Sequence, residues 1–244
     1  MSELILMLNS DKMNMKKMII ALFMVAATVT GFAQTSSFDK EIAPWHKLAT
    51  MQCGMLKASP VNAEQILKNL DELTSGLKVF TDKYLDNPPA EYAKDVNWKS
   101  YFLTLSENIV VVRERVEKKQ FAEASVYCST FCKTFGQMHK INGTMDLTDV
   151  TFSWRMELKN TTDMFTVGNK DGAKHNMEHL EMIYKMVVAK KAQRNDKAIN
   201  EVYKPIEEAY ASWLIAEKAV DVKAMNTTLK TFMDGFSKPY MASF

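Results

Sequence analysis

Large apolar residues recur at alternating spacings of four and three in one stretch of this 244-residue chain, between Pro60 and Tyr84. This period places their side chains along one side of an α-helix, and such a stripe is stable only when other helices cover it. Ser59 and Pro60 are typical of a helix start, and residues 87–89, Asn-Pro-Pro, of a helix end. The pattern therefore predicts a helix packed within a bundle. Its stripe comprises Ile66, Leu70, Leu73, Leu77, Phe80 and Tyr84.

Three more apolar stripes lie in the first half of the chain, and the earliest predicts a helix over about 38–57. Mostly short connections join the four segments, which is typical of an up-down-up-down four-helix bundle, here over residues 38–145. Glycine and proline number only 8 and 6, about half their usual share, so helices are favoured over turn-rich β structure. The three stripes are Ile42, Trp45, Ala49 and Leu56; then Trp98, Phe102, Leu105, Ile109, Val112 and Val116; then Phe121, Ala124, Cys128, Phe131, Phe135 and Met138.

The second half of the chain repeats this plan. Residues 199–240 can be laid on 98–139 without a gap, and Trp98, Phe102 and Ile109 then meet Ile199, Tyr203 and Tyr210. The order of four helices occurring twice predicts an all-α protein of two tandem four-helix bundles that arose by internal duplication. The second bundle is expected over 148–244, after a boundary at 142–144 and with Asp149 as an N-cap. A single eight-helix domain is the alternative.

The first 33 residues have the layout of a secretory signal peptide. Lysines at 16 and 17 precede an apolar run over 18–29, and small residues lead to an expected cleavage after Ala33. The run is too short for a spanning helix, which needs roughly 20 residues, so no membrane span is expected in the mature chain. We expect translation to begin at Met13 and the protein to be exported to the periplasm.

Charge is balanced in the expected mature chain. The whole sequence has 31 basic and 29 acidic residues, of which the leader contains three and two. Such balance leaves no basic surface of the kind that binds nucleic acid or an anionic membrane. The expected partner is therefore an unknown protein or a small ligand.

The three cysteines permit one disulfide in an oxidising compartment. On two antiparallel helices, the residue numbers of every facing pair add up to the same value. The numbers of His46 and His139 add up to 185, and so do those of Cys53 and Cys132. One register of the first and fourth helices would thus pair both sets, and it predicts a Cys53–Cys132 disulfide. A Cys53–Cys128 bond and the absence of any bond remain alternatives.

The stretch EKKQFAEASVYCSTFCKTFGQMHK and the fifteen-residue interval from Ala124 to His139 resemble the soluble four-helix b-type cytochromes and their cytochrome c-prime relatives. The resemblance implies a four-helix bundle, with haem b between the first and last helices. It makes His139 one axial ligand and a methionine of the first helix the other, which here would be Met51. In the register that pairs Cys53 with Cys132, the residue facing His139 is His46, which would be the alternative ligand. Covalent attachment is not expected, because the cysteines are spaced C-x-x-x-C and Lys133 follows them, whereas c-type sites read C-x-x-C-H.

The sequence HNMEH contains His175 and His179, four residues apart, which on a helix can bind one metal ion such as zinc or copper. A hydrolase of that type needs a third ligand and an open coordination position. Neighbouring sequence offers only glutamates for that role. The alternative is a solvated helix face.

No Ser-His-Asp order, glycine-rich phosphate loop or acid pair with supporting context occurs in the sequence. No catalytic residue is therefore predicted. The leading hypothesis is an exported, non-enzymatic binding or interaction protein, and the alternative is a haem-binding electron carrier that uses the first bundle.

Overall fold

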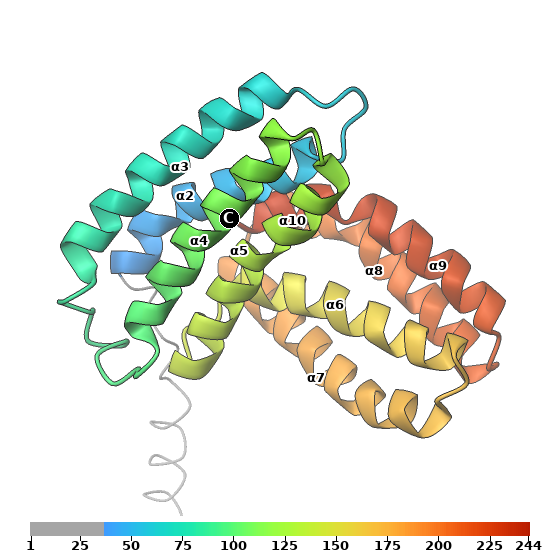
Figure 1. Cartoon of the computed structure of the whole chain (residues 1–244). Coiled ribbons are helices and arrows are strands. Elements are labelled where there is room, and N and C mark those ends of the chain that lie inside the picture. Colours follow the sequence, from blue (N-terminus) through green and yellow to red (C-terminus); the bar gives the residue numbers. More distant parts are fainter. Residues whose placement is uncertain (1–36) are drawn as a thin grey trace, which may run out of the picture. The chain divides into compact units, whose positions relative to one another are not determined.

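The computed structural model describes residues 37–244, and within that range all regular structure is helical (Figure 1). The prediction of an all-α protein is confirmed for this part of the chain. The signal-peptide prediction for 1–33 lies outside the described residues. No helix between residues 37 and 244 is both long and apolar enough to cross a membrane.

The helices of the first half are α2 (Ser37–Met55), α3 (Ala63–Tyr84), α4 (Trp98–Glu117) and α5 (Phe121–Asn142), and we call them the first helix group. Helix α2 packs against α3 and α5, and α4 packs against the same two helices. The predicted stripes form their common core, although Phe80 and Phe121 are only partly buried. Trp45 of α2 lies close to α3: its indole nitrogen donates to the Leu73 carbonyl at 2.8 Å, and a Cβ at Gly76 would lie 2.7 Å from its ring.

The second helix group consists of α6 (Leu147–Thr166), α7 (Lys170–Arg194), α8 (Lys197–Lys218), α9 (Val222–Gly235) and the short α10 (Ser237–Ser243). Helix α6 packs against α7 and α9, α8 packs against α9, and α10 contacts α6, α8 and α9. The largest fully buried side chains of its core are Trp154, Trp213, Tyr203 and Phe232. The buried thiol of Cys132 in α5 belongs to this second core, so the two groups are in contact.

The junction of the two groups is a well-capped pair of helix ends. Helix α5 ends at Asn142 and is capped by Gly143, whose φ of 69° is the left-handed conformation that glycine adopts without strain. Helix α6 begins with a capping box: Asp146 accepts a hydrogen bond from the Asp149 amide, and the Asp149 carboxylate accepts one from the Asp146 amide. The N-cap is therefore Asp146, and the prediction that Asp149 caps the helix is wrong by three residues, since Asp149 supplies the reciprocal bond.

Candidate functional site

Three buried ionisable side chains meet where α5 ends and α6 begins. His139 lies in the last turn of α5, Asp149 in the first turn of α6 and Asp39 in the first turn of α2. The His139 Nδ1 atom is 2.6 Å from Asp149 Oδ2, and its Nε2 atom is 3.4 Å from Asp39 Oδ1. A cation is favoured at a helix C-terminus and an anion at an N-terminus, so the helix ends themselves support this arrangement. We call these residues the His139 cluster.

Further hydrogen bonds join the cluster to the loop before α4. The Tyr92 hydroxyl donates to Asp39 Oδ1 at 2.6 Å and lies 2.8 Å from the Thr144 hydroxyl. Asp149 is also held by the amide of Asp146. The cluster therefore ties together α2, α5, α6 and the connection between α3 and α4.

The charges in the cluster shift one another's pKa values. Burial alone would lower the pKa of His139, but the charge of Asp149 and hydrogen bonds to both aspartates outweigh it and raise that pKa well above 6.5. Burial likewise would raise the pKa of Asp149, but His139 holds it below its usual value. Loss of solvation and the charge of Asp149 raise the pKa of Asp146 to about 7. At neutral pH, His139 is thus an imidazolium between two carboxylates.

His46 of α2 is close to the cluster but has the opposite protonation state. Its ring stacks on Phe135 of α5 with centroids 4.0 Å apart, and the ring of Phe244 meets it edge-on at 4.9 Å. Burial, reinforced by the charge of His139 and opposed by that of Asp149, lowers its pKa to about 3. His46 is therefore a neutral, aromatic part of the packing.

This neutral state predicts a pH-dependent effect of replacing His46. Below pH 6.5 the unfolded chain gains a proton at His46 that the folded chain does not, so stability falls as the pH falls from 6.5 towards 3. The variant His46→Phe has no group at this position that could take up a proton, so it does not lose stability in this way. We expect it to gain stability relative to the wild type by up to about 1.4 kcal/mol for each pH unit over that range. Urea unfolding at pH 7, 6, 5 and 4 measures the difference.

His175→Phe is the control for this experiment, because the His175 side chain is exposed. Its unfolding free energy should stay within about 0.5 kcal/mol of the wild type. If the unfolding free energies of His46→Phe and the wild type differed by the same amount from pH 7 to pH 4, the assignment of His46 as neutral would be contradicted.

The residues predicted to bind haem do not fit that group. An imidazolium has no lone pair for iron, and both nitrogens of His139 face carboxylates. The His46 ring is packed between Phe135 and Phe244, which occupy the space a porphyrin would need. Met51 points elsewhere on α2, where its side chain is 46% exposed. The structure does not bring the three predicted ligands together around one open site.

The structure pairs Cys53 with Cys128, at a Cα–Cα distance of 5.4 Å, and leaves Cys132 as a buried free thiol. The predicted Cys53–Cys132 bond is therefore wrong. The Cys132 sulfur lies 3.5 Å from the Thr50 hydroxyl, one turn before Cys53 on α2. Helix α5 is thus displaced along α2 by about one turn from the predicted register. The same displacement puts Phe135, and not His139, opposite His46.

A surface groove lies between α3 and α4, with a volume of about 480 Å³. Its apolar lining comes from both helices, and the exposed side chains of Leu103 and Val110 form one edge. Two lysines and three hydroxyl side chains are the polar groups at its border, and no carboxylate lines it. The lining residues are Thr74, Leu77, Lys78, Thr81, Leu85, Lys99, Phe102, Leu103, Ser106, Ile109 and Val110. The sequence stripes do not reveal this groove, because an apolar stripe predicts that its residues are packed in the core.

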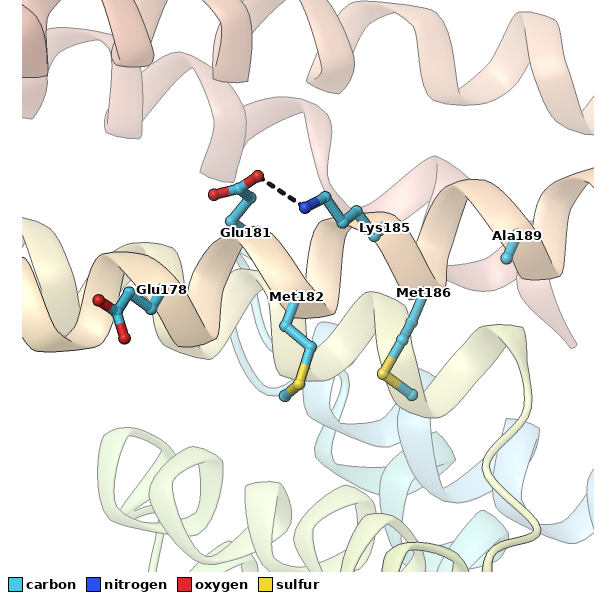
Figure 2. Close-up of a pocket in the computed structure, with 6 residues that line it drawn as sticks. All are labelled: Glu178, Glu181, Met182, Lys185, Met186 and Ala189. Atoms are coloured by element: carbon cyan, nitrogen blue, oxygen red, sulfur yellow. Dashed lines mark ion pairs between the residues drawn. The ribbon is translucent and has the colours of Figure 1, made fainter.

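A second hollow, of about 420 Å³, lies on α7, the helix that contains His175 and His179 (Figure 2). His175 is exposed, while His179 is half-buried with its Nδ1 atom 3.3 Å from Glu157 Oε1. Among residues 37–244, no group of three or more histidine, cysteine, aspartate or glutamate side chains suits a metal ion. Met182 and Met186 line the hollow, and neither His175 nor His179 does.

No protein-family model matches this sequence, and searches of the curated proteins and of the solved structures also gave no match. The resemblance to b-type cytochromes thus has no support from these comparisons.

Proposed function

We propose that this chain is an exported, non-enzymatic binding protein built from two tandem four-helix bundles, over 38–145 and 148–244, that arose by duplication. Support for the duplication comes from the repeated apolar stripes and from equivalent neighbours in the two helix groups. Helices α2 and α5 pack together as α6 and α9 do, and α4 packs on α5 as α8 packs on α9. Support for export comes from the layout of residues 1–33.

One observation favours binding over catalysis. The ionisable side chains with the most unusual surroundings, His139, Asp149 and Asp39, neutralise one another in the interior, where no substrate can reach them. The α3–α4 groove, by contrast, is open and apolar and has no acid–base pair in its lining. An open apolar lining suits the binding of a ligand, and without an acid–base pair it offers no general acid–base catalysis.

The dimensions of the groove favour a narrow ligand. It follows α3 from Thr74 to Leu85, which is about 16 Å at about 1.5 Å per residue. A volume of about 480 Å³ over that length gives a mean cross-section of about 30 Å². A helix about 10 Å wide, with a cross-section of about 80 Å², would lie mostly outside the groove. An extended alkyl chain fits this space better than a partner helix does.

The charges at its border favour an anionic head group. Lys78 and Lys99 line the groove, and their ion-pair partners, Asp82 and Asp86, do not. Both ion pairs are exposed and therefore weak, so an anionic ligand can take their place at little cost. We propose a small amphiphile with an apolar chain and a carboxylate or similar head as the occupant.

Calorimetric titration of the full-length protein with laurate tests this assignment. We expect saturable binding to one site, and binding at least tenfold weaker in Val110→Glu, because the new carboxylate places a charge beside the apolar chain. Val126→Glu on α5 is the matched control, since Val110 and Val126 are 62% and 70% exposed and only Val110 lines the groove. Dodecyltrimethylammonium, with the same chain and a positive head, should bind more weakly than laurate.

No saturable heat with laurate up to about 1 mM, the concentration at which only the weakest complexes form, would overturn the groove assignment. Equal losses of laurate affinity in Val110→Glu and Val126→Glu would also overturn the groove assignment. Export is tested separately: a mature N-terminus at Gln34 in the periplasmic fraction, read by mass spectrometry, is the expected result.

A further inference from the structure

Arg155 of α6 is a part-buried arginine whose side chain is fixed in position without an anionic partner among residues 37–244. Its Nε atom donates a hydrogen bond to the Met233 sulfur at 3.4 Å, and its guanidinium carbon lies 5.0 Å from the centre of the Phe236 ring. A guanidinium stacks well on an aromatic face, whereas a thioether is only a weak acceptor. These contacts therefore orient the guanidinium without neutralising its charge.

The other three arginines of the chain all donate to an oxygen atom of the protein. The pairs are Arg113 with the Asp71 carboxylate, Arg115 with the Glu123 carboxylate and Arg194 with the Ser243 carbonyl. For the two terminal nitrogens of Arg155, the described part of the chain provides no acceptor, and neither nitrogen is shut off from solvent. The N–H groups of these two nitrogens are thus available to an oxyanion.

Arg155 also has no acid among its neighbours on the surface of α6. The residues three and four positions before and after it are Thr151, Phe152, Leu158 and Lys159. Burial lowers the pKa of Arg155, and only the ionisable groups of Cys132 and Tyr240 oppose this shift, whereas a nearby carboxylate would raise the pKa. The charge of Arg155 is therefore uncompensated in the folded protein.

A second cation, Lys57, lies near Arg155 just after the end of α2. Partial burial and the charge of Arg155 both lower the pKa of the Lys57 ammonium. Lys57 has no ion-pair partner in the described residues, and the connection from Lys57 to Asn62 contains no acid. Because two like charges repel each other, an anion bound between them would remove an unfavourable interaction.

We propose that Arg155 and Lys57 bind a phosphate group, as free phosphate or as a phosphomonoester, and so link the end of α2 to α6. The guanidinium fork matches two oxygens of a phosphate, and the ammonium acts as a point charge for a third. A phosphomonoester has a charge of about −1.5 to −2 at pH 7, which balances two cations, whereas a carboxylate would balance only one. None of the residues that line the α3–α4 groove belongs to this site, so the proposal does not depend on the groove.

Calorimetric titration of the full-length protein with sodium phosphate at pH 7, with the ionic strength held constant by chloride, tests this site. We expect one equivalent to bind and the affinity to fall at least tenfold in Arg155→Met, which keeps an apolar stem and loses the fork. Arg115→Met is the matched control. Arg115 is also part-buried and lies 5.9 Å from the centre of the Tyr127 ring, but it has a carboxylate partner in Glu123.

The second cation and the source of the phosphate group are tested in the same way. Lys57→Met should weaken phosphate binding several-fold, whereas Lys47→Met, at another exposed lysine of the α2 segment, should not. Both lysines are exposed, so these variants should fold. Glycerol 3-phosphate is titrated in parallel, and the tighter of the two ligands identifies the source of the group. Acetate, with a single charge, should bind at least tenfold more weakly than either.

Stability measurements separate phosphate binding from a structural role of Arg155. Without phosphate, Arg155→Met should unfold at the same urea concentration as the wild type or at a higher one, because it keeps contact with Phe236 and removes an uncompensated charge. Phosphate at ten times its Kd should raise the folding equilibrium constant of the wild type about elevenfold beyond any change in the variant. The proposal is overturned if Arg155→Met binds phosphate as the wild type does, if Arg115→Met loses as much affinity, or if acetate binds as tightly as phosphate.

Discussion

Replacing His139 with alanine should lower the free energy of unfolding by about 3–5 kcal/mol at pH 7, the range typical of a broken buried ion pair. The substitution removes the imidazolium that lies 2.6 Å from the buried Asp149 carboxylate and 3.4 Å from that of Asp39. It also breaks the attachment of α5 to the first turn of α6. Urea or thermal unfolding followed by circular dichroism measures the loss.

The pH dependence of this loss follows from the two pKa shifts. The pKa of His139 is raised in the folded state. Its contribution to the free energy of unfolding is therefore fully present below pH 6.5 and is lost as the pH rises through the folded pKa. The pKa of Asp149 is lowered, so its contribution is present above pH 3.8 and is lost as the pH falls through the folded pKa. The difference in unfolding free energy between wild type and His139→Ala should therefore be largest between about pH 4 and 6.5 and should decrease at alkaline pH.

His175→Ala is the control for a general effect of losing a histidine, because the His175 side chain is exposed. It should change stability by no more than about 0.5 kcal/mol. If His139→Ala fails to fold, Asp149→Asn keeps the shape of the cluster and should still destabilise the protein. A loss below about 1 kcal/mol in either cluster variant would refute the ion-pair assignment.

Removing the disulfide should have an effect of similar size. The Cys53–Cys128 bond closes a loop over a sequence separation of 75 residues, and its loss frees the unfolded chain from that constraint. The loop-closure relation gives about 4 kcal/mol. We expect Cys53→Ala/Cys128→Ala to unfold at correspondingly lower urea than the oxidised wild type. Reduction of the wild type should cause a comparable loss.

The pairing itself can be read by non-reducing peptide mapping. The expected result is a linked peptide pair containing Cys53 and Cys128, with Cys132 alkylated only after unfolding, because its thiol is buried and burial raises its pKa. A linked pair containing Cys53 and Cys132 would contradict the register of α2 and α5 described above. Such a result would also remove the stacking of His46 on Phe135.

Helix positions were predictable to a large extent, because apolar periodicity is a local property. Leu70, Leu73 and Leu77 all lie in the core, and the breaks at Pro60 and at residues 87–89 fall in the connections on either side of α3. The Asp146 cap was missed by three residues, because an aspartate at either position suits a helix start. The pairing of His139 with Asp39 had no signal in the sequence, since the two are 100 positions apart, and Asp149 was singled out only as a helix cap.

The sequence by itself determined which residues form helices and which side of each helix is buried. The tertiary structure decided the offset of one helix along another, and with it the partner of Cys53, the neighbour of His46 and the role of His139. The physical reason lies in the period of the stripe. Sliding α5 along α2 by one turn moves each apolar residue onto the place of another apolar residue three or four positions away, so the buried surface changes little between registers. Side-chain shapes and the few buried charges select one of them, and those depend on all the packed helices together.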